Sequence, residues 1–162
     1  MSNQISATAS ISKLSDIEVS VKGSKIIIGP HSFVDSFVKM KFSGGRADII
    51  IGEKCYINSG CVLYSGNGIT LGNKVLIASN CTLSPSNHGI RKEFTMLEQP
   101  HMQSKGGIVI EDDVWIGANC VILDGTYIEK GCVIGAGSIV KGRLKQYGIY
   151  YGNPLKLQKY RS

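Results

Sequence analysis

A histidine and a nearby glutamate in the stretch SPSNHGIRKEF, residues 84–94, are the part of this chain that most directly suggests proton transfer. A neutral imidazole can remove a proton from a hydroxyl group near pH 7, so His88 could act as a general base. Glu93 could orient the other ring nitrogen, as carboxylates do in catalytic dyads and triads. The alternatives are an ordinary surface histidine and a solvated loop glutamate beside Arg91 and Lys92.

The other ligand-type residues do not predict a metal centre. A zinc site built from histidines would need His31, His88 and His101 to converge, and these three lie in different turn and loop contexts. The five cysteines are an odd number and form no C-x-x-C pair. This pattern argues against a disulfide framework and against a zinc ribbon.

The elements that position these residues follow from an internal repeat with an aliphatic residue at every sixth position. Its clearest run starts at Ile110 and reads IEDDVW, IGANCV, ILDGTY, IEKGCV, IGAGSI. A period of six fits neither a helix nor a long alternating strand. It fits an all-β fold, a triangular prism in which each coil consists of three short parallel strands, with the aliphatic residue pointing inward.

The cysteines test this frame independently. All five stand four places after a hexad aliphatic residue, where a side chain points inward near a corner with little space. We therefore expect them to be small buried residues, without a metal or redox role. Trp115 takes the last place of its hexad, so its side chain is expected to point outward.

The repeat also predicts the organisation of the chain as one domain, 1–162. Short insertions at 46–50 and 69–70 are expected to bulge at corners, and the predicted coils are 28–45, 51–68, 71–88, 110–127 and 128–145. Residues 89–109 form one long loop excursion, and loops of that length in a compact domain are usually functional. Residues 1–27 should form an N-terminal cap or first coil, 28–145 the β-helix, and 146–162 a C-terminal cap.

Composition sets the broad class. The chain has 162 residues with 18 Lys and Arg against 12 Asp and Glu, a net charge of +6 that favours anionic partners. The N-terminal sequence lacks the features of a signal peptide, and no apolar run approaches the roughly 18 residues of a membrane span. We expect a soluble cytoplasmic protein with at most peripheral membrane contact. Nucleic-acid binding is not expected, because no aromatic-interleaved basic platform is present.

Together the hexads, SPSNHG at 84–89, EDDVWIGANCVI at 111–122, IGAGSIVK at 134–141 and GNPLK at 152–156 resemble the hexapeptide-repeat acyltransferases. Within that family the chain is similar to sugar and polysaccharide O-acetyltransferases of the galactoside and maltose acetyltransferase type. The resemblance implies a left-handed parallel β-helix, a homotrimer with active sites between subunits, acetyl-CoA as co-substrate, a carbohydrate acceptor and no metal.

The same resemblance implies roles for individual residues. His88 matches the general base of a direct transfer, and Asn58 matches an asparagine near the acyl group, the alternative being a turn asparagine with positive φ. Trp115 matches a residue beside the pantetheine arm, although an exposed indole also fits a subunit contact. Ala118 and Ala136 match small residues whose backbone binds that arm, or serve simple packing.

A basic cluster near the C-terminus matches the places where the family uses positive charge against coenzyme A phosphates. Its members are Lys141, Lys156 and Lys159, with Pro154 in the turn that presents the last two. The sequence departs from the family's V-T-K run, since Lys141 takes the threonine place and Gly142 the lysine place. Two other functions stay open: N-acetylation of an amino sugar, and a non-catalytic β-helix scaffold or binding protein.

Overall fold

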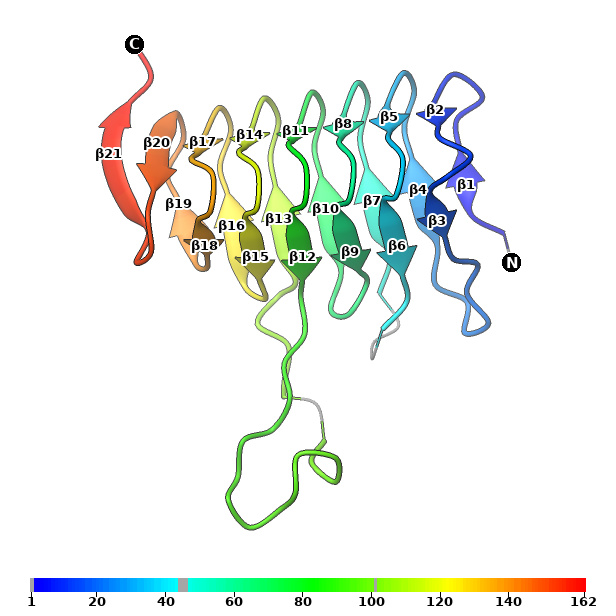
Figure 1. Cartoon of the computed structure of the whole chain (residues 1–162), viewed down its shortest axis with the longest axis vertical. Coiled ribbons are helices and arrows are strands. Elements are labelled where there is room, and N and C mark those ends of the chain that lie inside the picture. The colour runs from blue at the N-terminus through cyan, green and yellow to red at the C-terminus, as the bar shows by residue number, and fades with distance from the viewer. Residues whose placement is uncertain (1, 44–46, 101) are drawn as a thin grey trace.

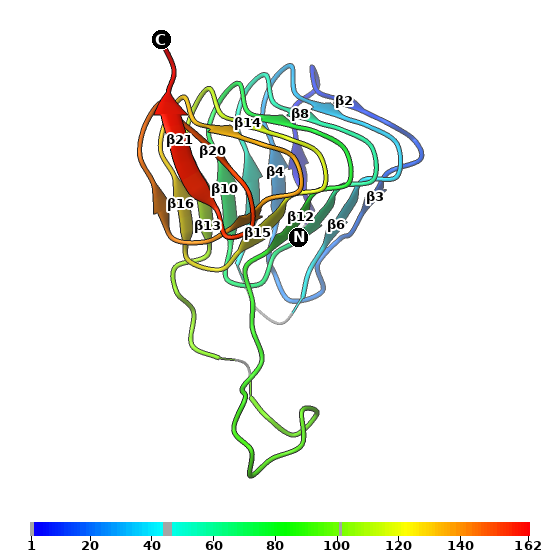
Figure 2. The same cartoon turned by 60° about the vertical axis from the view of Figure 1, so that its left-hand side comes forward.

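The chain folds into a left-handed parallel β-helix, a three-sided prism with one long arm (Figure 1). The structure is a computed structural model, and it describes residues 2–43, 47–100 and 102–162. Within these ranges the regular elements are strands, gathered into three sheets that form the three faces of the prism. Viewed at another angle, the coils superpose into a rounded triangular section (Figure 2).

The strands follow one another around the prism, so every third strand belongs to the same face. The first sheet contains β1 (Gln4–Ile5), β4 (Ile26–Ile28), β7 (Ile49–Ile51), β10 (Ile69–Leu71), β13 (Ile108–Ile110), β16 (Thr126–Ile128) and β19 (Arg143–Leu144). The second contains β2 (Ser10–Ile11), β5 (Phe33–Val34), β8 (Tyr56–Ile57), β11 (Leu76–Ile77), β14 (Trp115–Ile116), β17 (Val133–Ile134), β20 (Gly148–Tyr151) and β21 (Lys156–Tyr160). The third contains β3 (Asp16–Ile17), β6 (Lys39–Lys41), β9 (Val62–Tyr64), β12 (Thr82–Ser84), β15 (Val121–Leu123) and β18 (Ile139–Val140).

The core is a column of inward side chains that runs the length of the prism. Hexad aliphatic residues such as Ile57, Ile77 and Ile116 are fully buried and lie in register on neighbouring coils. The five cysteines are all buried and free, as the hexad frame predicts. Their thiols donate to backbone carbonyls of the next coil, for example Cys132 Sγ to Lys145 O at 3.0 Å.

Two of the three prism edges are turns of nearly constant length that rely on left-handed backbone. On the first edge, between the first and second sheets, the positive-φ residues are His31, Lys54, Lys74, Asp113, Gly131 and Tyr147. On the second edge, between the second and third sheets, they are Phe37, Gly60, Asn80, Asn119 and Gly137. Glycine, asparagine and aspartate tolerate this conformation best, and they take all of these positions on the second edge except Phe37. The repeated hexad glycines, such as Gly52 and Gly117, do not have positive φ; a Cβ there would lie within 2.6 Å of the next coil.

The third edge, between the third and first sheets, carries connections of very different length. Residues 65–68 join β9 to β10, whereas residues 124–125 alone join β15 to β16. Between β12 and β13 the chain leaves the prism as an arm, residues 85–107, of which all but residue 101 are described. The arm therefore departs four residues earlier than the predicted excursion over 89–109, and His88 lies on it rather than at the end of a coil.

The structure also corrects the predicted insertions and the start of the C-terminal cap. Residues 49–51 and 69–71 are strands of the first sheet instead of bulges at 46–50 and 69–70. Residues 143–151 continue the prism through β19 and β20, where a cap was expected from residue 146. At the N-terminus β1 to β3 form a first coil, one of the two alternatives predicted for residues 1–27, with Ile5, Ile11 and Ile17 at the hexad spacing.

The C-terminal end is closed by one hairpin. After Tyr151 the chain turns and β21 pairs antiparallel with β20, with every residue of β21 exposed. Arg161 Nη1 then donates to Asp113 Oδ2 at 2.9 Å and to Gly131 O at 3.0 Å. Among the described residues, no helix is long and apolar enough to cross a membrane.

We predict that the five thiols resist labelling in the folded protein. They are buried, and burial raises the pKa of Cys55 and raises that of Cys132 to about 11. Because a raised pKa keeps a thiol protonated, Cys132 should form the reactive thiolate only as the pH climbs toward that value. An aromatic disulfide reagent near neutral pH should label no cysteine until denaturant is added, and all of them afterwards. Rapid labelling of the native protein would contradict the inward register.

Candidate functional site

His88 lies on the outgoing leg of the arm, four residues after β12 ends at Ser84. Its side chain is exposed. Two backbone hydrogen bonds join the legs of the arm on either side of it: Met102 N to Asn87 O at 2.9 Å and Gly89 N to Pro100 O at 3.0 Å. The imidazole is therefore carried on a paired stem just outside the third edge of the prism.

Glu93 lies further out on the arm, exposed, in a turn closed by a hydrogen bond from Phe94 N to Arg91 O at 3.4 Å. The arm encloses a hollow of about 490 Å³ beside this turn, with apolar walls from Ile90, Phe94, Pro100 and Met102. Gln99 closes it and is only 6% exposed. His101, the third histidine, lies outside the described residues.

Asn58, Ala118 and Ala136 lie along the second edge. Gly137 N donates to Ala118 O at 2.8 Å, so the two alanines are on directly stacked coils. The backbone N and the side-chain Nδ2 of Asn58 both donate to Ile77 O, at 3.0 and 2.7 Å. The positive-φ residue of that turn is Gly60, with φ 74°, so Asn58 is not the left-handed turn residue that was considered as its alternative role.

Trp115 points outward from the second sheet, with 52% of its surface exposed. It lies in register with Leu76 on one side and Val133 on the other, and Leu76 with Tyr56. Phe33 continues the row, with ring centroids of Phe33 and Tyr56 6.0 Å apart. These five outward residues form a row that we call the apolar band, in which Tyr56, Leu76 and Trp115 are exposed and Phe33 and Val133 are half-buried. An exposed band of large apolar side chains is typical of a contact surface.

A groove of about 360 Å³ lies between the third sheet and the C-terminal hairpin. Its walls are mainly apolar and include Leu123, Ile139 and Leu157, and Lys141 and Pro154 line it as well. Lys156 and Lys159 lie on β21, which is exposed throughout. The predicted lysines are thus at the C-terminal end of the prism, near a groove that combines apolar walls with positive charge.

The predicted site residues do not all meet within one copy of the chain. Asn58, Ala118 and Ala136 follow the second edge of the prism, whereas His88 and Glu93 stand beyond the third edge. These two edges bound opposite sides of the third sheet. A single chain therefore presents two halves of the predicted site on the two sides of one face.

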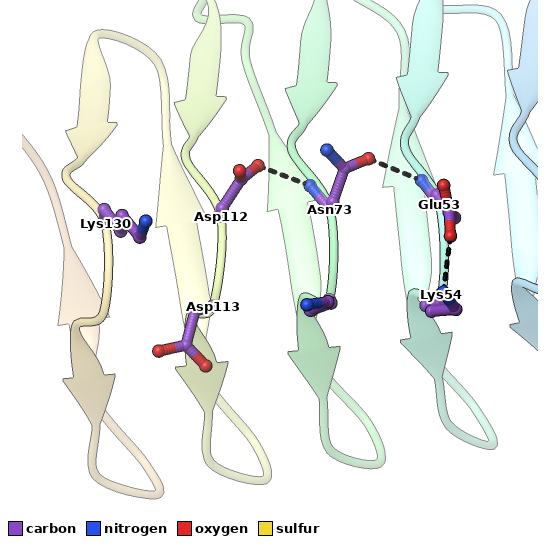
Figure 3. Close-up of a pocket in the computed structure, with 7 residues that line it drawn as sticks. Glu53, Lys54, Asn73, Asp112, Asp113 and Lys130 are labelled. Carbon is purple, nitrogen blue, oxygen red and sulfur yellow. Dashed lines mark hydrogen bonds and ion pairs between the residues drawn. The ribbon is translucent and has the colours of Figure 1, made fainter.

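The first edge carries a separate polar row, shown in Figure 3. Asp112 Oδ1 accepts from Asn73 N at 2.7 Å, and Asn73 Oδ1 accepts from Glu53 N at 2.8 Å. Lys54 lies 2.7 Å from Glu53, and this ammonium lowers the pKa of the Glu53 carboxyl. A hollow of about 580 Å³ opens over the row, and the side chains of Asp112 and Asn73 beside it each cap a turn amide of a neighbouring coil. We therefore assign this row a structural role.

Sequence reasoning missed two residues at the base of the arm. Asp124 is only 6% exposed and accepts hydrogen bonds from both Lys105 N and Gly107 N, at 2.9 and 3.0 Å. It also accepts from Asn67 Nδ2 at 3.2 Å. Both residues stand next to glycine, in Asp-Gly and Asn-Gly, which reads simply as turn sequence. Nothing in that pattern signals that the two side chains meet.

Within the described residues, no group of three or more histidine, cysteine, aspartate or glutamate side chains is arranged to hold a metal ion.

Comparisons with known protein families match the coils before the arm and the coils after it. Residues 107–142 match the model described as bacterial transferase hexapeptide (six repeats), and residues 48–85 the hexapeptide repeat of succinyl-transferase. Galactoside O-acetyltransferase of Escherichia coli K12 is 33% identical over 134 residues, which cover 80% of this chain and 61% of that protein. Galactoside O-acetyltransferase of Lactococcus lactis is 28% identical over 132 residues, which cover 82% of this chain and 61% of that protein.

A solved structure extends the likeness to the whole prism. The S84A mutant of AntD, an N-acyltransferase from Bacillus cereus in complex with dTDP-4-amino-4,6-dideoxyglucose and coenzyme A, superposes with a TM-score of 0.74 and 25% identity. The superposition covers 98% of this chain and 80% of that one. The two curated relatives are longer than the matched part, since the chain spans 61% of each. With hexads, prism and relatives in agreement, the chain belongs to the hexapeptide-repeat acyltransferase family.

Proposed function

We propose that the chain is an acetyltransferase that moves an acetyl group from acetyl-CoA to a hydroxyl of a sugar or of a surface-polysaccharide precursor. The observation that carries the proposal is the position of His88, an exposed imidazole on the paired stem of an arm that leaves a rigid prism. The two galactoside O-acetyltransferases among the relatives favour a sugar hydroxyl as the acceptor.

In this proposal His88 acts as general base. Its neutral imidazole takes the proton of the acceptor hydroxyl while the hydroxyl oxygen attacks, and the acetyl group is transferred directly without an acyl-enzyme. Glu93, on the same arm, orients the ring by accepting a hydrogen bond from its other nitrogen. The apolar hollow of the arm, lined by Phe94 and Gln99, offers a surface for the acceptor ring.

The groove at the C-terminal hairpin fits the donor. Acetyl-CoA supplies the acetyl thioester, and its pantetheine arm and phosphates need an apolar channel ending in positive charge. Ala118 and Ala136 offer backbone groups for the pantetheine along the second edge, and Trp115 provides an apolar face nearby. Lys141 and Pro154 line the groove itself. Lys156 and Lys159 on β21 provide charge for the phosphates.

A second copy of the chain completes the site. The backbone groups of Ala118 and Ala136 lie along the second edge and the base stands beyond the third, so in this proposal one protomer's arm meets its partner's second edge. The apolar band offers a surface for such a contact, because Tyr56, Leu76 and Trp115 expose 47, 44 and 52% of their area. A closed homotrimer forms three equal sites of this kind, one at each contact.

N-acylation of an amino sugar is the second candidate, favoured by the likeness to AntD, which is named as an N-acyltransferase and was solved with an amino sugar nucleotide. The same base and donor groove serve an amine acceptor. A non-catalytic scaffold is the third candidate. A cytoplasmic location belongs to the proposal too, since five free buried thiols suit a reducing compartment.

We predict that His88→Ala lowers kcat by about 10²- to 10⁴-fold, the usual contribution of a general base. Release of coenzyme A thiol is measured with a panel of sugars and amino sugars, and acetyl-CoA binding is measured separately and should persist. His31→Asn is the matched control, because His31 is an exposed histidine on the first edge with φ 55°, a conformation that asparagine tolerates. Near-wild-type turnover of His88→Ala would rule out His88 as the general base. If the wild-type protein released no thiol with any acceptor, the proposal that the chain is an acetyltransferase would be wrong.

Neutralising the basic cluster should weaken donor binding. In the triple variant Lys141→Gln, Lys156→Gln and Lys159→Gln the KM for acetyl-CoA should rise about tenfold, equal to about 1.4 kcal/mol, with less dependence on salt. The control replaces Lys13, Lys22 and Lys74 with glutamine, three exposed lysines away from the groove. Equal effects in both triples would mean that net charge alone matters and that the groove is not the donor site.

Sedimentation at assay concentrations should give the mass of a trimer, and a stable active monomer would exclude a shared site. Subunit mixing sharpens the test. His88→Ala lacks the base, while Ala118→Trp blocks the second edge, so each should be inactive alone. After dissociation and reassembly together, some contacts pair an intact arm with an intact edge, and thiol release should return. Continued inactivity of the mixture would place both halves of the site in one chain.

A further inference from the structure

The two legs of the arm are tied together at their base by a buried carboxylate. Asp124, in the short turn between β15 and β16, is 6% exposed. Its Oδ1 accepts from Gly107 N at 3.0 Å, and its Oδ2 accepts from Lys105 N at 2.9 Å. Both donors belong to the returning leg, just before β13 begins at Ile108. One side chain therefore fixes the point at which the arm rejoins the prism.

Asn67 connects this carboxylate to the outgoing leg. Its side-chain Nδ2 donates to Asp124 Oδ2 at 3.2 Å, and its backbone N donates to Pro85 O at 3.0 Å. Pro85 is the first residue of the arm, three positions before His88. Asn67 thus contacts the base of one leg directly and the base of the other through Asp124.

The surrounding backbone leaves little room for an alternative arrangement. Gly107 has φ 76°, and a Cβ there would lie 2.6 Å from Asn67 O and Gly68 O. Gly125 N donates to Gly107 O at 2.7 Å, and Ile108 N donates to Gly68 O at 2.9 Å. The returning leg is consequently packed between two coils, with the Asp124 carboxylate as the acceptor for its amides.

We infer that Asp124, together with Asn67, is a positioning residue for the imidazole of His88. A buried carboxylate with three N–H donors makes strong charge-assisted hydrogen bonds, and removing it leaves those donors unpaired. The inter-coil ladders of β12, β13, β15 and β16 do not use this side chain, so the prism can form without it. Its loss frees the legs of the arm, and its effect on turnover rests on the proposed function.

The structural half of the inference can be tested without any activity. In Asp124→Asn, hydrogen exchange at the amides of Lys105 and Gly107 and trypsin cleavage after Lys105 should each rise about tenfold over wild type, as for local opening. Asp48→Asn is the matched control, because Asp48 precedes β7 on the same edge and its carboxylate also accepts a backbone N–H, that of Lys25 at 2.7 Å. Exchange and cleavage equal to wild type in Asp124→Asn would overturn the inference.

The catalytic half is tested by the split between kcat and KM. Misplacement of a catalytic group by about 1 Å can cost about 10²-fold, so kcat of Asp124→Asn should fall by about 10- to 100-fold. The KM for acetyl-CoA should change less than about twofold, because the donor groove lies elsewhere, and circular dichroism should match wild type. Equal loss of donor binding, or loss of the β signal, would reduce Asp124 to a general structural residue and overturn the inference.

Reciprocal exchange provides a rescue. Asn67→Asp alone places two carboxylates together and should free the arm at least as much as Asp124→Asn. The double variant Asn67→Asp with Asp124→Asn restores one amide and one carboxylate, so both protection of the arm and kcat should recover part of their loss. Additive losses in the double variant would show that the two side chains act separately. If the wild-type protein releases no thiol, the proposed function fails. The exchange and cleavage results still decide whether the clamp, the contact of Asp124 and Asn67 with the base of the arm, holds the arm in place.

Discussion

The stacking of each coil directly on the next is the constraint on which the rest of the structure depends. Ile57, Ile77 and Ile116 lie in register because every strand bonds to the coils above and below it. A slip of one residue would turn this inward column to solvent, so register is strongly specified. Added residues can therefore leave the prism only at an edge. The third edge already accepts connections as short as 124–125 and as long as the arm.

The same constraint explains what the sequence predicts well. Inward aliphatic residues and the five buried cysteines recur at fixed spacing, and the structure confirms both. The boundaries fail where spacing varies. Ile49 and Ile69 take strand positions ahead of the hexads that start at Ile51 and Leu71, because connections at the third edge differ in length. The sequence left a cap and a first coil open for residues 1–27, because most other positions there are polar or small, although Ile5, Ile11 and Ile17 keep the period.

For the candidate site, too, the repeat predicts some features and not others. A repeat tells which column a residue occupies, and the exposure of Trp115 and the common edge of Ala118 and Ala136 follow from it. The repeat does not predict the distance between these residues and the arm, nor whether the two halves of the proposed site come from one chain or from two. Asp124 and Asn67 are 57 positions apart in the sequence, and each lies in a turn whose local sequence gives no sign of the other. Only the three-dimensional stacking of their turns brings them together.

Proton transfer requires donor and acceptor within hydrogen-bond reach, yet the arm that carries His88 extends away from the stacked coils. The buried clamp of Asp124 and Asn67 fixes the arm where it begins, but it cannot fix the outer end. There Ile90, Met96 and Leu97 expose 77, 63 and 94% of their surface. Burial of this apolar surface away from water would be favourable. In the proposed assembly the partner's surface covers these side chains and restrains the second end of the arm. In that assembly the position of the imidazole depends jointly on a polar contact within the chain and an apolar contact between chains, so the proposed activity requires assembly.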